Sequence, residues 1–160
     1  MLLRMVKKLS PFIILFILIL DQLSKFLVLK HWQMFPLSLA PFFDLVLVWN
    51  RGLSFGILNT LSYPWISYVL GTFVLGVLGY VGLLLVREKK ESLVLAYSFI
   101  IGGGLGNLID RVIHGAVVDF LDFYIMTYHW PAFNVADSFV VVGVALYTWV
   151  HFCHSSTKYN

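Results

Sequence analysis

Four long runs of apolar residues follow one another along the chain, separated by more polar stretches. They cover Pro11–Leu29, Pro64–Val86, Leu93–Ile109 and Asp137–Phe152. A helix needs roughly 20 mostly apolar residues to cross the hydrocarbon core of a bilayer. We therefore predict one α-helical membrane domain over residues 1–160, with four transmembrane helices and two long connections, at 30–63 and 110–136.

The first long connection contains a pattern typical of a β-strand. The segment FFDLVLVWN (42–50) is rich in β-branched and aromatic residues that partly alternate, and Gly52 and Gly56 favour a turn after it. Because an open sheet edge cannot face lipid, we expect a small sheet at the outer membrane surface. A re-entrant or interfacial loop is the alternative interpretation.

The second long connection has the composition of a segment at a membrane interface. Tyr124, Tyr128 and Trp130 are of the residue types that gather where the membrane meets water. Pro131 should end any helix in this region. We expect Val112–Phe133 to lie in the interface rather than to cross the membrane.

Charged residues are scarce and unevenly placed. The chain is 60% hydrophobic and 12% charged, whereas a soluble domain has about a quarter charged residues. Its net charge of +3 follows the predicted topology and does not indicate nucleic-acid binding. Basic residues precede the first span, separate the second from the third and follow the fourth: Arg4, Lys7, Lys8, Arg87, Lys89, Lys90 and Lys158. By the positive-inside rule both termini are then cytoplasmic.

The N-terminal run has an alternative interpretation as a secretory signal peptide, because basic residues precede an apolar stretch. No small-residue cleavage site follows it, and the run continues through Asp21 and Lys25. We therefore favour a retained membrane span. Cys153 is the only cysteine in this sequence, so we expect neither an internal disulfide nor a cysteine-based metal site.

Five aspartates occur in or beside the apolar runs, where acidic residues are rare. They are Asp21, Asp110, Asp119, Asp122 and Asp137. An ionised carboxylate in hydrocarbon costs several kcal/mol unless it has a partner or reaches water. These aspartates are therefore candidates for a functional site.

The predicted topology brings Asp119 and Asp137 to the same depth. The third span runs outward and ends shortly before Asp119, and the fourth starts at the outer face with Asp137. Charges about 4 Å apart repel by about 4 kcal/mol at an effective dielectric constant near 20, so such a pair can hold one proton. One carboxylate can then take a proton from water while the other acid donates to a peptide carbonyl, as in aspartic peptidases.

Two alternatives stay open at this stage. Asp137 stands at a plausible helix N-terminus, where an aspartate can serve simply as a cap. Asp122, three residues from Asp119, can take the place of Asp119 in the pair. Capping alone, however, does not explain why the acidic residues concentrate on one side.

Two further pairs share helix faces. Asp21 and Lys25 are four residues apart in the order that favours pairing, so a buried ion pair that fixes helix packing is the simplest interpretation. Such a pair can still support the site. Gly102 and Gly106 are also four apart and allow a neighbouring helix to approach closely.

An arginine and three asparagines complete the polar set. Asn107 and Arg111 share a helix face, and Arg111 can neutralise a carboxylate or hold a peptide carbonyl. Asn50, Asn107 and Asn134 can hydrogen-bond a substrate backbone.

Histidines raise the possibility of a metal site. His114 and His129 are the relevant ones, together with the aspartates, but no regular ligand spacing supports such a site. We expect that the activity needs neither a metal nor a cofactor.

Five segments together resemble the bacterial lipoprotein signal peptidases. They are DQLSK (21–25), NRGLSFG (50–56), GGGLGNLIDR (102–111), GAVVDF (115–120) and PAFNVADS (131–138). One such segment alone is a weak signal, whereas five in the family's order, with matching length and span number, are specific. This family removes the signal peptide from prolipoproteins whose cysteine carries a diacylglyceryl group.

The resemblance implies roles for individual residues. Asp119 and Asp137 would form the catalytic pair, which decides between Asp119 and Asp122. Supporting or substrate-binding roles would fall to Asp21, Lys25, Asn50, Gly103, Asn107, Arg111 and Asn134. Arg51 stands at a position of the second segment that we regard as variable.

The resemblance also implies a fold and a cellular setting. Members have four spans, an extracytoplasmic β-cradle and an interfacial helix, use no metal and are inhibited by globomycin. We therefore expect a monomeric endopeptidase of the bacterial cytoplasmic membrane, with both termini in the cytoplasm and its active site at the extracytoplasmic face. Its partners would be lipid-modified prolipoproteins and membrane lipid.

Two other classes of function use some of the same features. A small proton- or ion-coupled transporter also needs intramembrane charges, but it should place polar groups in both halves of the bilayer and often has an inverted repeat. Here the polar groups cluster on the outer side, and no repeat is apparent. An assembly or scaffold subunit would not need paired carboxylates.

Overall fold

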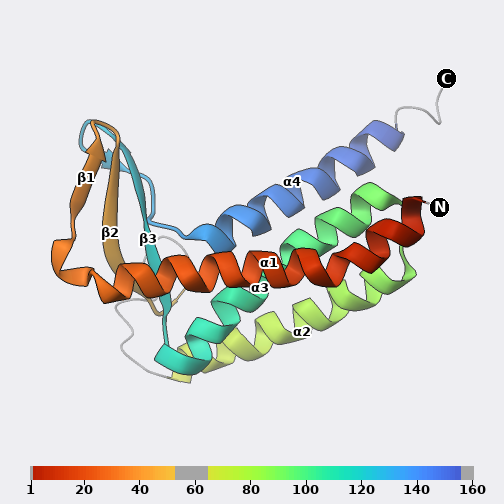
Figure 1. Cartoon of the computed structure of the whole chain (residues 1–160), viewed down its shortest axis with the longest axis horizontal. Coiled ribbons are helices and arrows are strands. Elements are labelled where there is room, and N and C mark those ends of the chain that lie inside the picture. Colours follow the sequence, from red (N-terminus) through yellow and green to blue (C-terminus); the bar gives the residue numbers. More distant parts are fainter. Residues whose placement is uncertain (1, 53–64, 156–160) are drawn as a thin grey trace.

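Four long helices and a small antiparallel sheet make up the described part of the protein (Figure 1). The computed structural model describes residues 2–52 and 65–155. The helices are α1 (Leu2–Lys30), α2 (Trp65–Arg87), α3 (Glu91–His114) and α4 (Val135–Ser155). Each is long and apolar enough to cross a membrane, which confirms the four predicted spans. The protein is a multi-pass membrane protein.

Helix α1 extends further toward the N-terminus than predicted, because it continues through Pro11. A proline has no N–H to bond the carbonyl four residues earlier, which here is that of Lys7. Ser10 Oγ donates to that same Lys7 oxygen at 3.0 Å. The hydroxyl therefore satisfies the acceptor that Pro11 leaves free, and the helix is not interrupted. Pro64, the predicted start of the second span, lies outside the described residues.

The sheet lies at the end of the bundle opposite the N-terminus (Figure 1). Its strands are antiparallel in the order β1 (Leu37–Ala40), β2 (Phe43–Asn50), β3 (Val117–Ile125) and β4 (Tyr128–His129). A short 3₁₀ helix, Trp32–Met34, joins α1 to β1. The strand expected in the first long connection is β2, so this prediction is confirmed. The predicted turn through Gly56 lies outside the described residues.

The second long connection forms strands β3 and β4, which the sequence did not predict for this segment. Strand β3 pairs with β2 from Asn50↔Val117 to Phe43↔Phe123, so the two connections build one sheet. Pairing satisfies backbone groups that an open edge would expose. The interfacial helix implied by the family resemblance is not found between residues 115 and 134, and residues 53–64 lie outside the described part.

Helix α3 lies at the centre of the bundle and contacts α1, α2 and α4. A Cβ atom at Gly102 would lie 3.0 Å from Ile17 Cβ of α1, and a Cβ atom at Gly106 would meet the Asp21 carboxylate. The two glycines therefore allow the close helix approach predicted from their spacing. Half of the most apolar stretch of α3 is buried, against 11% of that of α2, so α3 is shielded from lipid far better than α2.

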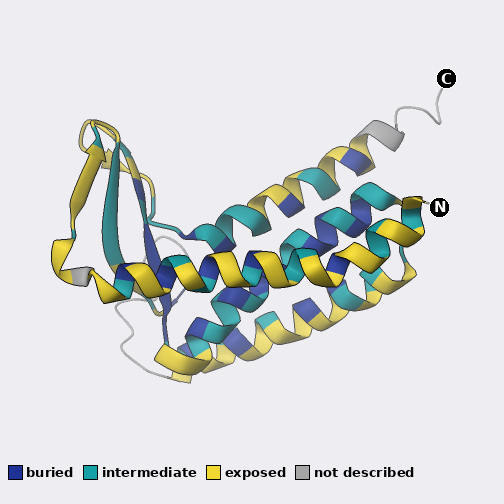
Figure 2. Cartoon of the chain, viewed as in Figure 1, coloured by how far each residue is buried: buried dark blue, intermediate teal, exposed yellow. Residues whose placement is uncertain are grey.

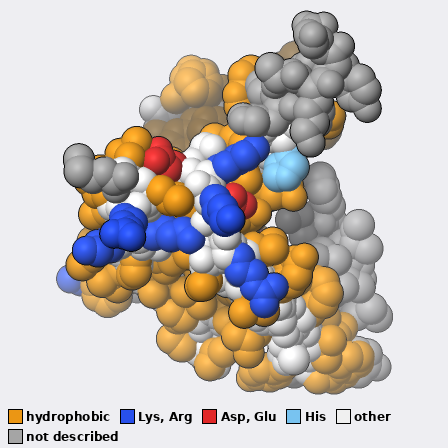
Figure 3. Space-filling view, turned by 90° about the vertical axis from the view of Figure 1, so that its right-hand side faces the viewer, with side chains coloured by type: hydrophobic (Ala, Val, Ile, Leu, Met, Phe, Trp, Pro, Cys, Tyr) orange, Lys and Arg blue, Asp and Glu red, His pale blue; other side chains and the backbone are white. Residues whose placement is uncertain are grey.

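The outward faces of the helices are apolar and exposed, as a lipid environment requires (Figure 2). Lys and Arg side chains gather at the end of the bundle that carries the N-terminus (Figure 3). They come from the first turns of α1 and from the α2–α3 connection: Arg4, Lys7, Lys8, Arg87, Lys89 and Lys90. The basic end and the sheet therefore lie at opposite ends of the bundle.

Candidate active site

Asp119 is buried in β3, a few residues beyond the end of α3. Gly115 ends α3 in the left-handed conformation (φ 66°), which glycine adopts without strain, and the chain turns there into β3. The residue is only 2% exposed. Asp119 Oδ2 accepts a hydrogen bond from Asn50 Nδ2 of β2 at 2.9 Å, and Oδ1 accepts one from Asn134 Nδ2 at 2.7 Å. Both carboxyl oxygens are therefore held by amide donors.

Asp137 lies in the first turn of α4, where it forms a reciprocal cap with Asn134. The Asp137 N–H donates to Asn134 Oδ1 at 2.9 Å, and the Asn134 N–H donates to Asp137 Oδ2 at 3.2 Å. This is the geometry of a capping box, so the capping interpretation of Asp137 is confirmed. The other oxygen, Oδ1, accepts from Asn107 Nδ2 at 2.7 Å.

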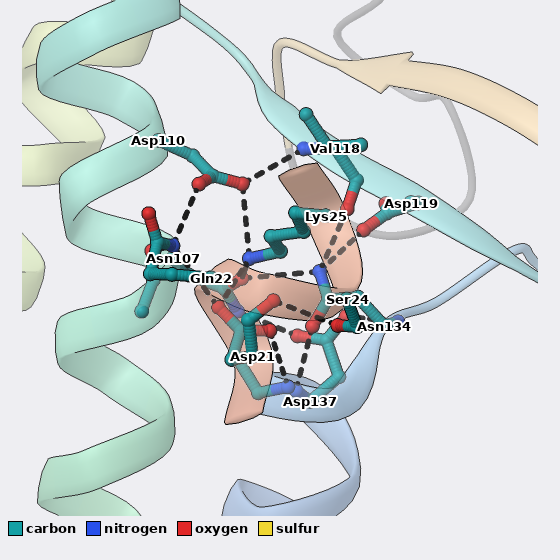
Figure 4. Close-up of polar contacts among 12 residues, drawn as sticks. Asp21, Gln22, Ser24, Lys25, Asn107, Asp110, Val118, Asp119, Asn134 and Asp137 are labelled. Carbon is teal, nitrogen blue, oxygen red and sulfur yellow. Dashed lines mark hydrogen bonds and ion pairs between the residues drawn. The ribbon is translucent and has the colours of Figure 1, made fainter. Parts of the chain in front are cut away.

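Asn134 brings the two carboxylates together (Figure 4). Its side-chain amide donates to Asp119, while its backbone N–H and its side-chain oxygen bond Asp137. The same Nδ2 also lies 3.1 Å from Asn107 Oδ1. Because Asn134 is fully buried, these contacts form away from solvent and fix the relative position of both acids.

The electrostatics of the pair favour one proton. Burial raises the pKa of Asp119 to about 7, and the negative charge of Asp137 adds to the rise. Hydrogen bonds from Asn50 and Asn134 and the positive charge of Lys25 act in the opposite direction. Asp119 therefore retains its proton up to near-neutral pH, as one member of an acid–base pair must.

Asp122 belongs to a different cluster. It lies three residues from Asp119 in a regular strand, so the two side chains point to opposite faces of β3. Asp122 Oδ2 lies 2.8 Å from His129 Nδ1, and Asp44 is its direct partner across β2 and β3. The strand geometry therefore separates the rival carboxylate from Asn134.

The predicted pair of Asp21 and Lys25 is present and buried. Lys25 Nζ lies 2.8 Å from Asp21 Oδ2, but it also lies 2.9 Å from Asp110 Oδ2 and 3.1 Å from Asn107 Oδ1. Gln22 Nε2 donates to both carboxylates as well, at 3.2 and 3.0 Å. Asp110 and Gln22 were not assigned roles from the sequence.

Arg111 binds backbone oxygens, and Gly103 leaves room for a neighbouring helix. Arg111 donates to the backbone oxygens of Asn107 and Gly52 of its own chain, at 3.3 and 3.5 Å. A Cβ atom at Gly103 would collide with the backbone oxygen of Ala136. Gly103 therefore allows α3 to touch the first turn of α4, next to Asp137.

The two histidines considered for a metal site lie apart. His114 packs edge-on against Trp49, with ring centroids 5.4 Å apart, and His129 bonds Asp122. In residues 2–52 and 65–155 no group of three or more His, Cys, Asp or Glu side chains has the arrangement of a metal site.

An open groove of about 630 Å³ runs along α4 from the candidate site. Asp137 and Ser138 contribute to its lining, and the rest of the lining is mainly apolar: Trp130, Pro131, Ala132, Phe133, Val140, Val141 and Val142. Val141 is 66% exposed on the outer face of the helix. The groove therefore connects a buried carboxylate with the lipid-facing surface.

Known proteins with similar sequences are signal peptidases. The model of the family described as "Signal peptidase (SPase) II" matches residues 13–153. A lipoprotein signal peptidase of Burkholderia mallei (strain SAVP1) is 43% identical over 134 residues, 82% of this chain and 80% of the relative. One of Shewanella sp. (strain MR-4) is 41% identical over 152 residues, 91% of this chain and 87% of the relative.

Solved structures agree with this relationship. A bacterial membrane enzyme determined at 2.3 Å by the in meso method superposes with a TM-score of 0.76 at 30% identity, covering 93% of this chain and 90% of the other. A second one, at 1.9 Å, has a TM-score of 0.72 at 29% identity, covering 88% and 90%. With this fold, and with a family match over most of its length, the chain belongs to the signal peptidase II family of membrane peptidases.

Proposed function

We propose that this protein removes the signal peptide from diacylglyceryl-modified prolipoproteins, cleaving before the lipidated cysteine with Asp119 and Asp137 as the catalytic pair. The observation that carries the proposal is the position of Asn134, which hydrogen-bonds both carboxylates inside the protein. Family membership supplies the substrate class. The proposal adds the residues and the mechanism.

Asp119 is the acid and Asp137 the base in this mechanism. Water attacks the scissile carbonyl carbon and loses a proton to Asp137, while Asp119 donates its proton to the carbonyl oxygen. The resulting gem-diol collapses as Asp119 takes that proton back. The C–N bond breaks, and the leaving amine receives the proton from Asp137. The raised pKa of Asp119 supports its role as the initial proton donor.

The groove along α4 provides a path for the lipid of the substrate. Asp137 lines the groove together with mainly apolar side chains, one of which, Val141, is exposed on the outer face of the helix. An acyl chain can remain in the bilayer while the cysteine to which it is attached reaches the carboxylate. The lipid then sets the depth of the scissile bond, and small misplacement of reacting atoms costs about 10²-fold in rate.

The orientation that fits this function places the sheet and the catalytic pair at the extracytoplasmic face. The basic end of the bundle then faces the cytoplasm, as the positive-inside rule requires. Cysteine labelling in whole cells tests this orientation, with Lys89→Cys expected to be protected and Tyr128→Cys expected to react.

The decisive experiment measures cleavage of one prolipoprotein, with and without its diacylglyceryl group, by the purified protein in detergent micelles. We expect the lipidated form to be cleaved with a much higher kcat/KM, and mass spectrometry should find the lipidated cysteine at the new N-terminus. Two carboxylates activate water without a Lewis acid, so EDTA should leave the rate unchanged. Equal cleavage of both forms would indicate a general membrane protease, and loss of activity in EDTA restored by zinc would overturn the mechanism.

A further inference from the structure

Lys25 of α1 lies at the centre of a buried ion cluster beside the catalytic pair. The cluster consists of Lys25, Asp21, Asp110 and Gln22. The ammonium binds one oxygen of each carboxylate, at 2.8 Å for Asp21 and 2.9 Å for Asp110. Lys25 is 2% exposed, and Asp21 and Asp110 are 0% and 2% exposed. Charges this deeply buried are stable only as a set, because removal of one member leaves an uncompensated charge.

The two carboxylates of the cluster also bind backbone amides, and the position of these amides is informative (Figure 4). Asp21 Oδ1 accepts the Ala136 N–H at 2.9 Å, and Asp110 Oδ2 accepts the Val118 N–H at 3.0 Å. Ala136 directly precedes Asp137, and Val118 directly precedes Asp119. Each cluster carboxylate therefore holds the residue immediately before one member of the catalytic pair.

A second connection runs through Asn107. Its Oδ1 accepts from Lys25 Nζ at 3.1 Å, and its Nδ2 donates to Asp137 Oδ1 at 2.7 Å. An asparagine amide can be turned over in its site, but only one orientation presents its oxygen to an ammonium. Lys25 therefore also keeps the donor end of Asn107 directed at Asp137.

We propose that Lys25 is the positioning residue of this active site, holding Asp119 and Asp137 in register through the Asp110 and Asp21 carboxylates. The proposal rests on the proposed function, because it presupposes that these two aspartates carry out catalysis. Lys25 itself is buried and is not among the residues that line the groove along α4. Its effect therefore falls on the geometry of the pair and not on substrate binding.

The test compares the wild type with Lys25→Met and with Lys7→Met as a matched control. Lys7 is on the same helix and bonds a carbonyl of α2, Val86 O at 2.8 Å, at an exposed site away from the acids. We expect Lys25→Met to lower kcat about 10- to 100-fold, since misplacement of reacting groups acts on the chemical step. KM should change by less than about twofold, because ground-state binding is unaltered. Lys7→Met should match the wild type.

The pH profile separates positioning from general damage to the fold. The positive charge of Lys25 lowers the pKa of Asp119, so its removal should move the alkaline limb of kcat to higher pH. A loss of folded enzyme alone would reduce the activity at every pH without moving the limb. An unchanged limb together with an unchanged kcat would overturn the proposal.

Hydrogen–deuterium exchange gives a readout that does not depend on activity. In detergent micelles, Lys25→Met should speed exchange of the amides at both Val118 and Ala136, by about tenfold or more, as local anchors are lost. Asp110→Asn should affect mainly Val118, and Asp21→Asn mainly Ala136, so the inference can be judged even if Lys25→Met does not fold. Unchanged exchange at both amides would contradict it. If the wild type does not cleave lipidated prolipoprotein, the proposed function fails, whereas the exchange data still decide whether Lys25 anchors both aspartates.

Discussion

Two aspartates of strand β3, Asp119 and Asp122, have the same side chain and nearly the same burial but different surroundings. Asp119 is 2% exposed and is held by two asparagine amides. Asp122 is 8% exposed and bonds His129, whose side chain is 52% exposed. The first has neighbours inside the protein, and the second has a partner that reaches solvent.

The difference shows how one strand separates a catalytic candidate from a structural acid. Alternation along β3 directs Asp119 toward the helix bundle and Asp122 toward the sheet face that carries Asp44. On the bundle side, the Asn134 N–H also donates to the carboxylate of Asp137, so a second acid lies close to Asp119. On the other side, Tyr124 OH donates to Asp44 Oδ1 at 3.2 Å. The partners, and not the residue type, distinguish the two sites.

The strongest way to break the comparison is to neutralise each acid in turn. Asp119→Asn or Asp137→Asn should lower kcat by about 10²- to 10⁴-fold, because an amide cannot exchange the catalytic proton. Asp122→Asn should change kcat by less than about threefold, since a pair with a half-exposed histidine contributes little. The measurement is cleavage of a lipidated prolipoprotein by protein of equal Tm. Inactivation by Asp122→Asn with a mild effect of Asp119→Asn would reverse the assignment.

A smaller loss should follow when the asparagine shared by the pair is removed. Asn134→Ala leaves both carboxylates in place but takes away the side-chain donor to Asp119 and the side-chain acceptor of the Asp137 N–H. Buried groups without partners cost about 1–3 kcal/mol, so we expect kcat to fall roughly 10- to 100-fold. Tyr124→Phe is the matched control, because it removes a donor to Asp44 on the opposite face. Equal kcat values for Asn134→Ala and the wild type would show that the pair needs no such connection.

The pH dependence should sharpen the comparison further. Since the pKa of Asp119 is raised to about 7, the acid form is lost above that pH and kcat should fall there. The Asn50 hydrogen bond stabilises the carboxylate form, so Asn50→Ala should raise the pKa and move the alkaline limb upward, by less than about one pH unit. A limb that moves to lower pH would refute this account.

The smallest expected effect is on stability. The raised pKa of Asp119 means that the folded protein binds a proton that the unfolded chain releases between about pH 4 and 7. Its contribution to stability is therefore fully present at low pH and is lost as the pH rises toward 7. An asparagine does not titrate, so Asp119→Asn does not lose stability in this way. The Tm difference, variant minus wild type, should therefore increase from pH 5 to pH 8. A Tm difference that does not vary with pH would contradict the burial of this charge.

The sequence allowed the helices and one of the four described strands to be predicted, for definite reasons. Apolar runs of membrane-spanning length predict helices, and the β-branched, aromatic segment of β2 predicts a strand. Strand β3 was missed although VVDFLDFYI is rich in the same residue types. Most of β3 is buried on both faces, so the alternation that signals a strand is absent.

The candidate site was also predicted only in part. Five acids in an apolar chain, and the motifs around them, pointed to Asp119 and Asp137. The contacts of Gln22 and Asp110 were not predictable, because they join α1 to α3 across most of the chain. No spacing rule covers residues that meet only after helices pack.

The amino-acid sequence by itself determined that this is a membrane protein with four spans, a cluster of acids near one end and the motifs of a peptidase family. These properties follow from composition and from order along the chain, which are local. Only the tertiary structure decided which acids meet. The register of β3 against β2 turns Asp119 inward and Asp122 away, and the glycines of α3 let α1 and α4 approach closely enough for Asn134, Asp137 and the Lys25 cluster to share one buried site. These orientations and contacts depend on the simultaneous packing of elements that are distant in sequence.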